Sequence, residues 1–374
     1  MSKHMKKKLV IIGAGYAGIN LVNKLSNNSD IEITLINKTA YHLHQTDIHK
    51  YISGQSDFEE VAFDLKQYAN KKNINFVEAT VTNVDFNTKK VFLEDKEIAY
   101  DYLTIATGSV SFFPRQIKNI EAYAQDIKDI AILKEQREKF LSVINSDKKN
   151  KNIAIVGGGL SGVEIALEFA HVLKEKNINE DQCTISIIEQ LPNVLPNMDP
   201  FLVDNTIAAC NDLNVKQYHG AFVSEVKDDT VYLSDKREIP FDMILLVIGV
   251  TSEKLAKEEE VNVKNQFVVD DYLRLINHRE VFVIGDIAQT KDKNDKYVLP
   301  TAQMAKLHAN LTAQNIENTL NEKALIKNGC ETKGIMVDLA NKNAVGLLMG
   351  LKVKGFVAYY LKRFVSNQHN KLFS

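Results

Sequence analysis

Residues 9–18 read Leu-Val-Ile-Ile-Gly-Ala-Gly-Tyr-Ala-Gly, and residues 153–162 read Ile-Ala-Ile-Val-Gly-Gly-Gly-Leu-Ser-Gly. Each is a short apolar run that leads into the pattern Gly-x-Gly-x-x-Gly and then into a helix-like segment, 19–25 or 163–173. In a strand–turn–helix unit these glycines allow a tight turn, a close approach of the backbone to a diphosphate, and close packing of helix on strand. The helix N-terminus then binds the anion through its free N–H groups and its dipole.

The two fingerprints predict two dinucleotide sites in one chain, and therefore electron transfer between two dinucleotides. One match alone would be weak evidence, because glycine-rich turns are common. The alternative is a degenerate second unit and a single bound nucleotide. The expected cofactor contacts are Gly13, Ala14, Gly15, Tyr16, Ala17 and Gly18 in the first copy, and Gly157, Gly159 and Gly162 in the second.

The composition is typical of a globular protein with two or three domains. The chain has 374 residues, of which 45% are hydrophobic and 25% charged. A formal net charge of −2 gives no reason to expect a nucleic-acid partner. The three cysteines, Cys183, Cys210 and Cys330, are far apart and form no metal-binding pattern, which favours a reducing compartment. No apolar run reaches the roughly 18 residues of a membrane-spanning helix.

An internal repeat extends beyond the glycines. Residues 91–101 resemble residues 231–242, and each segment has the alternation and turn residues of a small β-meander. Each meander leads into a buried strand that ends in glycine, at Gly108 and at Gly249. The later span 281–286 is expected to be a strand that returns to the first unit. We therefore expect two similar nucleotide-binding units, one inserted into the other.

The residue that ends the second strand of each unit indicates which ribose is bound. In the second unit this residue is Glu189. A carboxylate there accepts hydrogen bonds from a ribose 2′-hydroxyl and repels a 2′-phosphate, so NADH is favoured over NADPH. The alternative is an acid that faces solvent at the end of its strand.

In the first unit the equivalent residue is Asn37, followed by Lys38. A neutral amide can still bind a ribose hydroxyl, and two other segments favour FAD here. The segment Ala106-Thr107-Gly108 and the pair Gly285-Asp286 stand where flavoproteins of this build have their second and third flavin segments. Asp286 can bind the ribityl chain; the alternative role for this aspartate is a helix N-cap.

The expected fold is α/β, with an NADH-binding Rossmann-like domain inserted into an FAD-binding one, followed by a C-terminal membrane-interface or dimer segment. The first part of the FAD domain is expected at 1–112 and the NADH domain at 113–262. The second part of the FAD domain is expected at 263–325, and the C-terminal segment at 326–374.

Taken together, the chain resembles the type II NADH:quinone oxidoreductases, within the superfamily of flavoproteins that bind two dinucleotides. The resemblance covers nearly the whole chain. The glycine motifs are common to the superfamily, whereas the Ala-Gln-x-Ala segment and the C-terminal part are specific to the quinone-reducing branch. The residues that carry it are 11–18, Tyr41-His42, 106–108, 157–164, Gly285-Asp286, 302–305 and 344–350.

The resemblance implies FAD-dependent oxidation of NADH with two-electron reduction of a membrane quinone, without proton pumping. Glu164 would lie at the junction of nicotinamide and flavin and orient the nicotinamide or relay protons; the alternative is a solvent-facing helix residue, like Glu168 one turn later. The resemblance also assigns flavin-site roles. His42 would lie near the flavin, Ala302 and Gln303 would border flavin and quinone, the Val81 backbone would contact the adenine, and Lys371 would reach back to the flavin.

The chain departs from the family pattern at one place in the expected quinone site. The family usually continues Ala-Gln-x-Ala-x-Gln, whereas here Leu307 takes the last position and His308 follows. Either His308 replaces the lost polar group, or it lies on the helix surface.

Several other flavoenzyme classes require cysteines that this chain does not have at the corresponding positions. Disulfide reductases need a cysteine pair, and peroxide or oxygen reductases a single cysteine, in the region that here reads 41–47 without one. A sulfide:quinone oxidoreductase remains an alternative, although only Cys330 lies in the C-terminal region. Another flavin-dependent NADH oxidoreductase and a non-enzymatic NADH-sensing protein are further alternatives.

The sequence predicts no metal site. His42, His44, His49 and Asp47 are close in sequence, but their spacing fits no helical or strand set of ligands.

The C-terminal segment predicts an interfacial helix. The apolar residues Phe356, Val357, Tyr360, Leu361 and Phe364 fall on one helical face, and Lys362 and Arg363 lie off it. We expect this face to attach the protein peripherally to the cytoplasmic side of the cell (inner) membrane, in a homodimer. The alternatives are a helix packed on the domain core or a dimer contact.

Overall fold

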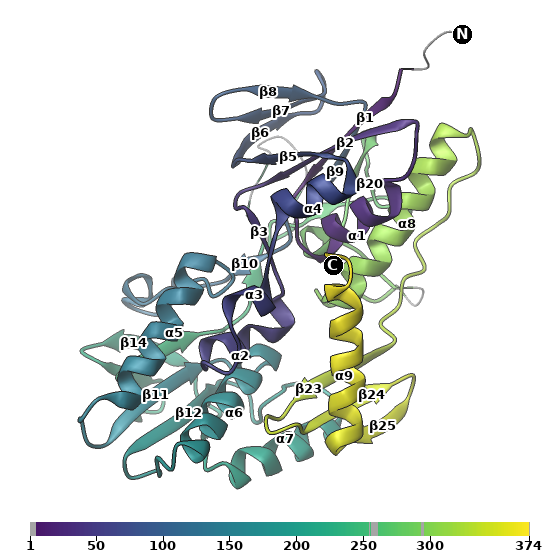
Figure 1. The fold of residues 1–374 in the computed structure, drawn as a ribbon. Helices are drawn as coiled ribbons and strands as arrows, with labels where there is room; N and C mark the ends of the chain where they lie inside the picture. The colour runs from purple at the N-terminus through teal and green to yellow at the C-terminus, as the bar shows by residue number, and fades with distance from the viewer. Residues whose placement is uncertain (1–4, 254, 256–260, 293–294, 374) are drawn as a thin grey trace.

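The computed structural model describes residues 5–253, 255, 261–292 and 295–373 (Figure 1). Two sheets, the first mainly parallel and the second entirely so, lie one above the other in Figure 1, and the yellow C-terminal helix lies beside the lower unit with its end below the upper one. This α/β architecture agrees with the expected fold class.

The first sheet has the strand order β20-β21-β9-β1-β2-β5. Its central strand β1 (Lys7–Ile12) pairs in parallel with β2 (Ile31–Asn37) on one side and with β9 (Tyr102–Ile105) on the other. The chain therefore reverses its direction across the sheet at β1, and a ligand crevice is expected at the carboxyl ends of β1 and β9. The other strands are β5 (Asn75–Glu78), β20 (Arg274–Leu275) and β21 (His278–Val283).

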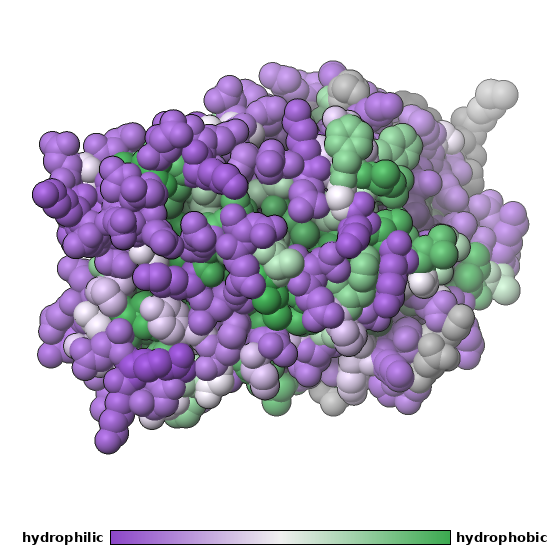
Figure 2. Space-filling view, turned by 90° about the horizontal axis from the view of Figure 1, so that it is seen from below, coloured by the Kyte–Doolittle hydropathy of each residue, from purple (hydrophilic) through white to green (hydrophobic). Residues whose placement is uncertain are grey.

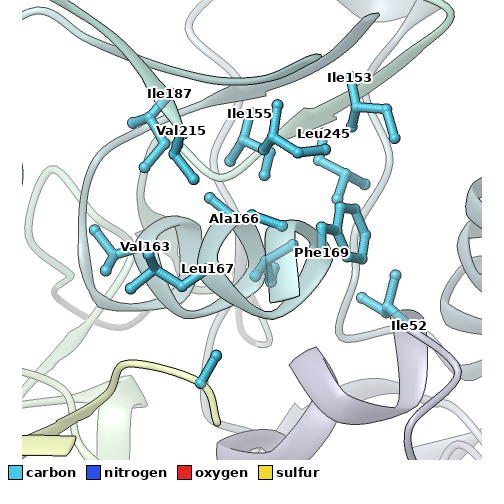
Figure 3. Packing of buried hydrophobic residues seen from close by; sticks show 14 of the residues in the cluster. Ile52, Ile153, Ile155, Val163, Ala166, Leu167, Phe169, Ile187, Val215 and Leu245 are labelled. Atoms are coloured by element: carbon cyan, nitrogen blue, oxygen red, sulfur yellow. The ribbon is translucent and has the colours of Figure 1, made fainter. Parts of the chain in front are cut away.

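The second sheet, in the order β13-β12-β11-β17, is entirely parallel. Its strands are β11 (Lys151–Val156), β12 (Cys183–Glu189), β13 (Lys216–His219) and β17 (Met243–Leu246). Helix α6 (Leu160–Glu175) covers one face, where its Phe169 packs near Ile155 of β11 (Figure 3). The cluster also includes Ile52 of α2 (Ile48–Ile52), so one core joins the inserted unit to the first.

The predicted meanders are present in both units. One comprises β6 (Val81–Asp85), β7 (Lys90–Leu93) and β8 (Glu97–Ala99), and the other comprises β14 (Val223–Lys227), β15 (Thr230–Leu233) and β16 (Glu238–Pro240). Each has a bulge in its first hairpin, between Val81 and Asn83 or between Val223 and Glu225. The internal repeat therefore includes the position of this β-bulge.

A short antiparallel ribbon forms where the chain passes between the two units. Strand β10 (Val110–Ser111) pairs with β18 (Val250–Thr251). The chain thus leaves the first unit and returns to it through adjacent strands, as expected for an inserted domain.

The remaining elements connect and cover these sheets. The helices and turns are α1 (Tyr16–Leu25), η1 (Gln45–Asp47), α3 (Phe58–Val61), α4 (Leu65–Lys72), η2 (Ile120–Ala122), α5 (Ile130–Asn145), α7 (Pro200–Asp212), η3 (Gly285–Ile287) and α8 (Ala302–Leu320). The short strands are β3 (Tyr41–Leu43), β4 (Ala62–Asp64), β19 (Phe267–Val268) and β22 (Ala288–Gln289).

The C-terminal segment forms a three-stranded antiparallel sheet and a helix. Its elements are β23 (Gly334–Asp338), β24 (Ala344–Leu348), β25 (Leu351–Lys354) and α9 (Gly355–Asn370). Beyond the helix, the Phe373 ring stacks on Phe63 of the first unit with ring centroids 4.6 Å apart. The segment therefore spans from the inserted unit to the first unit (Figure 1).

Candidate active site

The first fingerprint requires glycine because its backbone is in close contact with neighbouring segments. Gly13 has φ +100°, and a Cβ there would lie 2.4 Å from the Ala106 carbonyl oxygen. A Cβ at Gly18 would lie 2.0 Å from the Gly13 carbonyl oxygen, so α1 packs directly on the turn. The second fingerprint repeats this geometry, with a Cβ at Gly162 placed 1.9 Å from the Gly157 oxygen.

Both fingerprints present open helix N-termini that fit a diphosphate. Gly15 is the N-cap of α1 and Gly159 is the N-cap of α6, and neither helix end has a capping side chain among the described residues. A Cβ added at either glycine would meet no described atom within 4 Å. The first amide groups of each helix thus lack side-chain partners and are accessible to an anion.

Glu189 and Asn37 occupy equivalent places and hold the two fingerprint turns in the same way. Glu189 Oε2 accepts a hydrogen bond from the Gly158 N–H at 2.8 Å, and Asn37 Oδ1 accepts one from the Ala14 N–H at 2.9 Å. Glu189 is buried, so its interpretation as a solvent-facing acid is wrong. A carboxylate oxygen can accept more than one hydrogen bond, so these contacts leave capacity for a ribose hydroxyl. Lys38, next to Asn37, is exposed.

Asp286 lies within the turn η3, at the carboxyl end of β21. Its Oδ2 accepts a hydrogen bond from the Ser109 hydroxyl at 2.8 Å, and the Lys128 ammonium donates to the same hydroxyl at 2.6 Å. The N-cap of η3 is Ile284, so the N-cap role for Asp286 is wrong. The third predicted flavin segment is thereby brought next to the second, which ends at Gly108.

The start of α8 carries the predicted flavin-border residues Ala302 and Gln303. The Thr301 hydroxyl caps this helix by accepting from the Met304 N–H at 3.1 Å. Gln303 Oε1 accepts a hydrogen bond from the Lys333 N–H at 2.6 Å, so this side chain links α8 to the C-terminal segment.

The structure decides between the two interpretations of His308. The residue is buried, and its Nδ1 accepts a hydrogen bond from the Gly285 N–H at 3.3 Å. His308 therefore supports the turn that carries Asp286, and its placement on the helix surface is wrong. Burial lowers its pKa to about 4, so it is neutral at physiological pH. Leu307 is half-buried.

Two further predicted contacts lie at the margins of the units. Val81 begins β6 and is half-buried. The Gly249 carbonyl accepts a hydrogen bond from the Phe112 N–H at 2.9 Å, beside the ribbon that connects the units.

Glu164 lies where the inserted unit meets the C-terminal segment. Its Oε1 accepts a hydrogen bond from the Asp338 N–H at 2.8 Å and contacts the Lys362 ammonium. Glu164 is therefore not a free solvent-facing residue. Glu168, one turn later, is buried as well, and burial raises its pKa. The expectation that Glu168 could face solvent is wrong because β23 and α2 cover this face of α6.

Among the described residues, one group of side chains has the donor set of a metal site: His49, Glu168 and Asp338, whose ligand atoms lie within 4.8 Å of one another. It shares only His49 with the histidines weighed from the sequence. However, Lys50 Nζ lies 3.4 Å from Asp338 Oδ2, and His49 Nε2 lies 3.6 Å from the same oxygen. Burial alone would lower the pKa of His49, but the Asp338 and Glu164 carboxylates raise it above its ordinary value. Protein cations thus already compensate Asp338.

A cluster of buried histidines lies beside the first fingerprint. His42 Nδ1 donates to the Ala14 carbonyl oxygen at 2.7 Å, so its Nε2 accepts the 3.0 Å hydrogen bond from Nε2 of His369. Burial lowers the pKa of His42 to about 3 and that of His44 to about 4. The resemblance assigned a return contact to Lys371, which is exposed; His369, two residues earlier, lies against Tyr16 of the first fingerprint, with ring centroids 4.6 Å apart.

Helix α9 presents charged residues to the protein. Lys362 contacts Glu164 of the inserted unit, and Arg363 Nη1 lies 3.1 Å from Asp47 Oδ2 of the first unit. Sequence reasoning missed these contacts, although the polar positions Lys362, Arg363, Ser366 and His369 follow helical spacing opposite the apolar stripe.

The apolar face of α9 points outward. Phe356 is 63% exposed and Phe364 is 62% exposed. The alternative in which this face packs on the domain core is therefore wrong. Figure 2, which views the molecule from below, shows green hydrophobic residues at the surface among purple polar ones. The exposed apolar residues of the helix are Phe356, Val357, Tyr360, Leu361, Phe364 and Val365, here called the α9 face.

In the described ranges, no helix has the length and apolar character needed to cross a bilayer. Burial raises the pKa of the Cys183 thiol to about 11 and that of Cys210 to about 12, and it also raises the pKa of Cys330, so the protonated form is favoured at each.

Known proteins that resemble this chain also have the fold described above. A family model described as "Pyridine nucleotide-disulphide oxidoreductase" matches residues 7–309. The type II NADH:quinone oxidoreductase of Staphylococcus saprophyticus is 27% identical over 97% of this chain and 95% of its own length. The resemblance stated from the sequence is thereby confirmed.

Solved structures share the fold. NDH2 from Plasmodium falciparum, in complex with NADH, superposes with a TM-score of 0.86 at 21% identity, covering 98% of this chain and 96% of that one. The sulfide:quinone oxidoreductase from Aquifex aeolicus gives a TM-score of 0.79 at 18% identity, covering 97% and 90%.

Proposed function

Because the chain belongs to the pyridine nucleotide-disulphide oxidoreductase family, we propose that it oxidises NADH and transfers two electrons through bound FAD to a quinone. The observation that carries this proposal is the pair of open helix N-termini at Gly15 and Gly159, one in each unit. Similarity to type II NADH:quinone oxidoreductases over the whole chain supports the acceptor.

The residues present fit FAD on the first fingerprint. Gly13–Gly18 would hold the diphosphate, Asn37 the adenosine ribose and Asp286 the ribityl chain, while Ala302 and Gln303 would border the ring. The flavin, when bound, supplies the hydride and electron chemistry, and the protein supplies position and electrostatics.

Glu164 is proposed to position the nicotinamide side of the site. It belongs to α6, the helix that follows the second fingerprint, and it is fixed by Asp338 and Lys362. A carboxylate held in this way cannot rotate freely, so it can orient a bound nicotinamide or accept a proton at a fixed atom.

Anaerobic addition of NADH to the purified protein tests this function. We expect the flavin absorbance to bleach rapidly and to return when a soluble quinone analogue is added. Absence of bleaching would refute the assignment. Sulfide-dependent bleaching would instead favour the sulfide:quinone alternative, for which Cys330 is the one cysteine in the C-terminal region and is half-buried.

Glu189 is proposed to select NADH. Replacing it with glutamine keeps an oxygen acceptor for the fingerprint turn but removes the charge that repels a 2′-phosphate. We expect the ratio of kcat/KM for NADH to kcat/KM for NADPH to fall about tenfold or more. Steady-state kinetics with both coenzymes measure this ratio. Glu135→Gln, an equal charge change at an exposed position of α5, is the control and should leave the ratio unchanged.

The α9 face is proposed to dock on the cytoplasmic side of the cell membrane, so that a lipid-soluble quinone can reach the flavin. Six apolar residues are exposed on one helix, and Lys352 and Lys354 lie just before it. Apolar side chains flanked by basic ones are typical of an interfacial helix. A homodimer, which the resemblance also suggests, would compete for this surface if it used the same face.

A further inference from the structure

Lys306 lies beside the first fingerprint. It belongs to α8, and its Nζ lies 5.5 Å from the ring centroid of Tyr16. Tyr16 is the first residue of α1, the helix whose N-terminus forms the dinucleotide cradle. The ammonium therefore lies at the edge of the proposed FAD site, on the same helix as Ala302 and Gln303.

Among the residues that the structure describes, this ammonium has no anionic partner. Across residues 5–253, 255, 261–292 and 295–373, Lys306 makes no ion pair and no hydrogen bond; its one contact of this kind is with the Tyr16 ring. Asp47, the acid of the adjacent histidine cluster, already accepts from the Ser366 hydroxyl at 2.9 Å and pairs with Arg363 at 3.1 Å.

The neighbouring titratable groups do not compensate the charge. Burial lowers the pKa values of His42, His44 and His369, and the positive charge of Lys306 lowers them further. These histidines are neutral at physiological pH. Burial also lowers the pKa of Lys306 itself. Partly buried charges are normally paired, because desolvating an unpaired ion is costly.

We propose that Lys306 is the counter-charge for the negative charge of bound FAD. This inference rests on the proposed function. Two parts of FAD can supply this negative charge. The diphosphate is anionic in both redox states, and the flavin ring becomes anionic when it is reduced by two electrons. Lys306 is thus a positioning residue of the flavin site, and it lies outside the glycine fingerprint in the sequence.

The test compares Lys306→Met, which removes the charge at similar volume, with Lys306→Arg, which keeps it. Lys323→Met is the matched control, because Lys323 is exposed just beyond the end of α8. FAD is titrated into each apoprotein, and the midpoint potential of each holoprotein is measured by spectroelectrochemistry. Thermal unfolding of the apoproteins is measured in parallel.

We expect Lys306→Met to weaken FAD binding about tenfold if the diphosphate is the partner. If the reduced ring is the partner, Lys306→Met should bind oxidised FAD as the wild type does but bind reduced FAD about tenfold less tightly. The two-electron midpoint potential of the bound flavin should then fall by about 30 mV. Lys306→Arg should restore either value. The apo form of Lys306→Met should unfold at the same temperature as the wild type or at a higher one, because an unpaired charge has been removed.

Unchanged FAD affinity and potential in Lys306→Met would overturn the inference, as would an equal change in Lys323→Met. A lower unfolding temperature of the apo variant with no specific effect on FAD would also overturn it, because that result indicates a purely structural lysine. If the wild-type protein itself neither binds FAD nor is reduced by NADH, the proposed function fails first. The two failures are therefore distinguishable.

Discussion

Gly162→Ala is expected to abolish reduction of the bound flavin by NADH, whereas Gly18→Ala is expected to prevent flavin binding. A Cβ at Gly162 would lie 1.9 Å from the Gly157 oxygen, and a Cβ at Gly18 would lie 2.0 Å from the Gly13 oxygen. The obstacle in each case is backbone, so the helix must move away from its turn and its N–H groups leave the diphosphate position. We expect a loss of more than about 100-fold in each affected step.

The two variants separate the two sites in one experiment. Flavin content is read from the absorbance of the purified protein, and reduction by NADH is followed by anaerobic stopped flow. Gly162→Ala should retain flavin that dithionite, but not NADH, reduces at the wild-type rate. Gly329→Ala is the control, because a Cβ there meets no described atom within 4 Å. Loss of flavin in Gly162→Ala with retention in Gly18→Ala would reverse the assignment of cofactors to fingerprints.

Phe356→Glu combined with Phe364→Glu is expected to release the protein from membranes. Both side chains are more than half exposed on the α9 face. Each buried aromatic side chain contributes about 2 kcal/mol to transfer from water, and the introduced carboxylates are repelled by anionic lipid. We expect binding to anionic vesicles to fall at least about 100-fold. Co-sedimentation with the vesicles measures this loss.

Activity measurements on the same double variant distinguish a loss of membrane attachment from a loss of catalysis. Reduction of a quinone embedded in vesicles should fall with binding, whereas reduction of a water-soluble quinone analogue should persist. The control combines Phe222→Glu with Ile276→Glu, two similarly exposed apolar residues outside α9. If the α9 variant instead changes from dimer to monomer in size-exclusion chromatography and binds vesicles as the wild type does, the face is a dimer contact.

Local sequence patterns were sufficient for the two strand–turn–helix units and their meanders. Part of the glycine requirement is local, since a Cβ at Gly18 would clash with Gly13, five residues away, whereas a Cβ at Gly13 would clash with Ala106 of a different strand segment. The position of Glu189 at the end of its strand is also local. The sequence placed Glu189 at the end of its strand, as the structure does, but the hydrogen bond that Glu189 accepts from the Gly158 N–H became visible only in three dimensions.

Contacts between residues far apart in the sequence could not be predicted from local patterns. The sequence correctly showed an apolar stripe on α9, but it could not show that this stripe points outward. The orientation depends on Lys362 and Arg363, whose partners Glu164 and Asp47 are distant in sequence and belong to two different units. Likewise, the interpretations of His308 and Glu168 as surface residues failed because the covering elements, η3, β23 and α2, come from other parts of the chain.

The sequence by itself therefore determined that the chain forms two related strand–turn–helix units, each with a glycine fingerprint, because the turn and the helix that follows it are built from contiguous residues. Only the tertiary structure decided how the units are joined, which face of α9 is free and which charges lack partners. These properties depend on the packing of the first unit, the inserted unit and the C-terminal segment against one another. The unpaired ammonium of Lys306, on a helix that sequence reasoning considered only for its neighbours, is the clearest example.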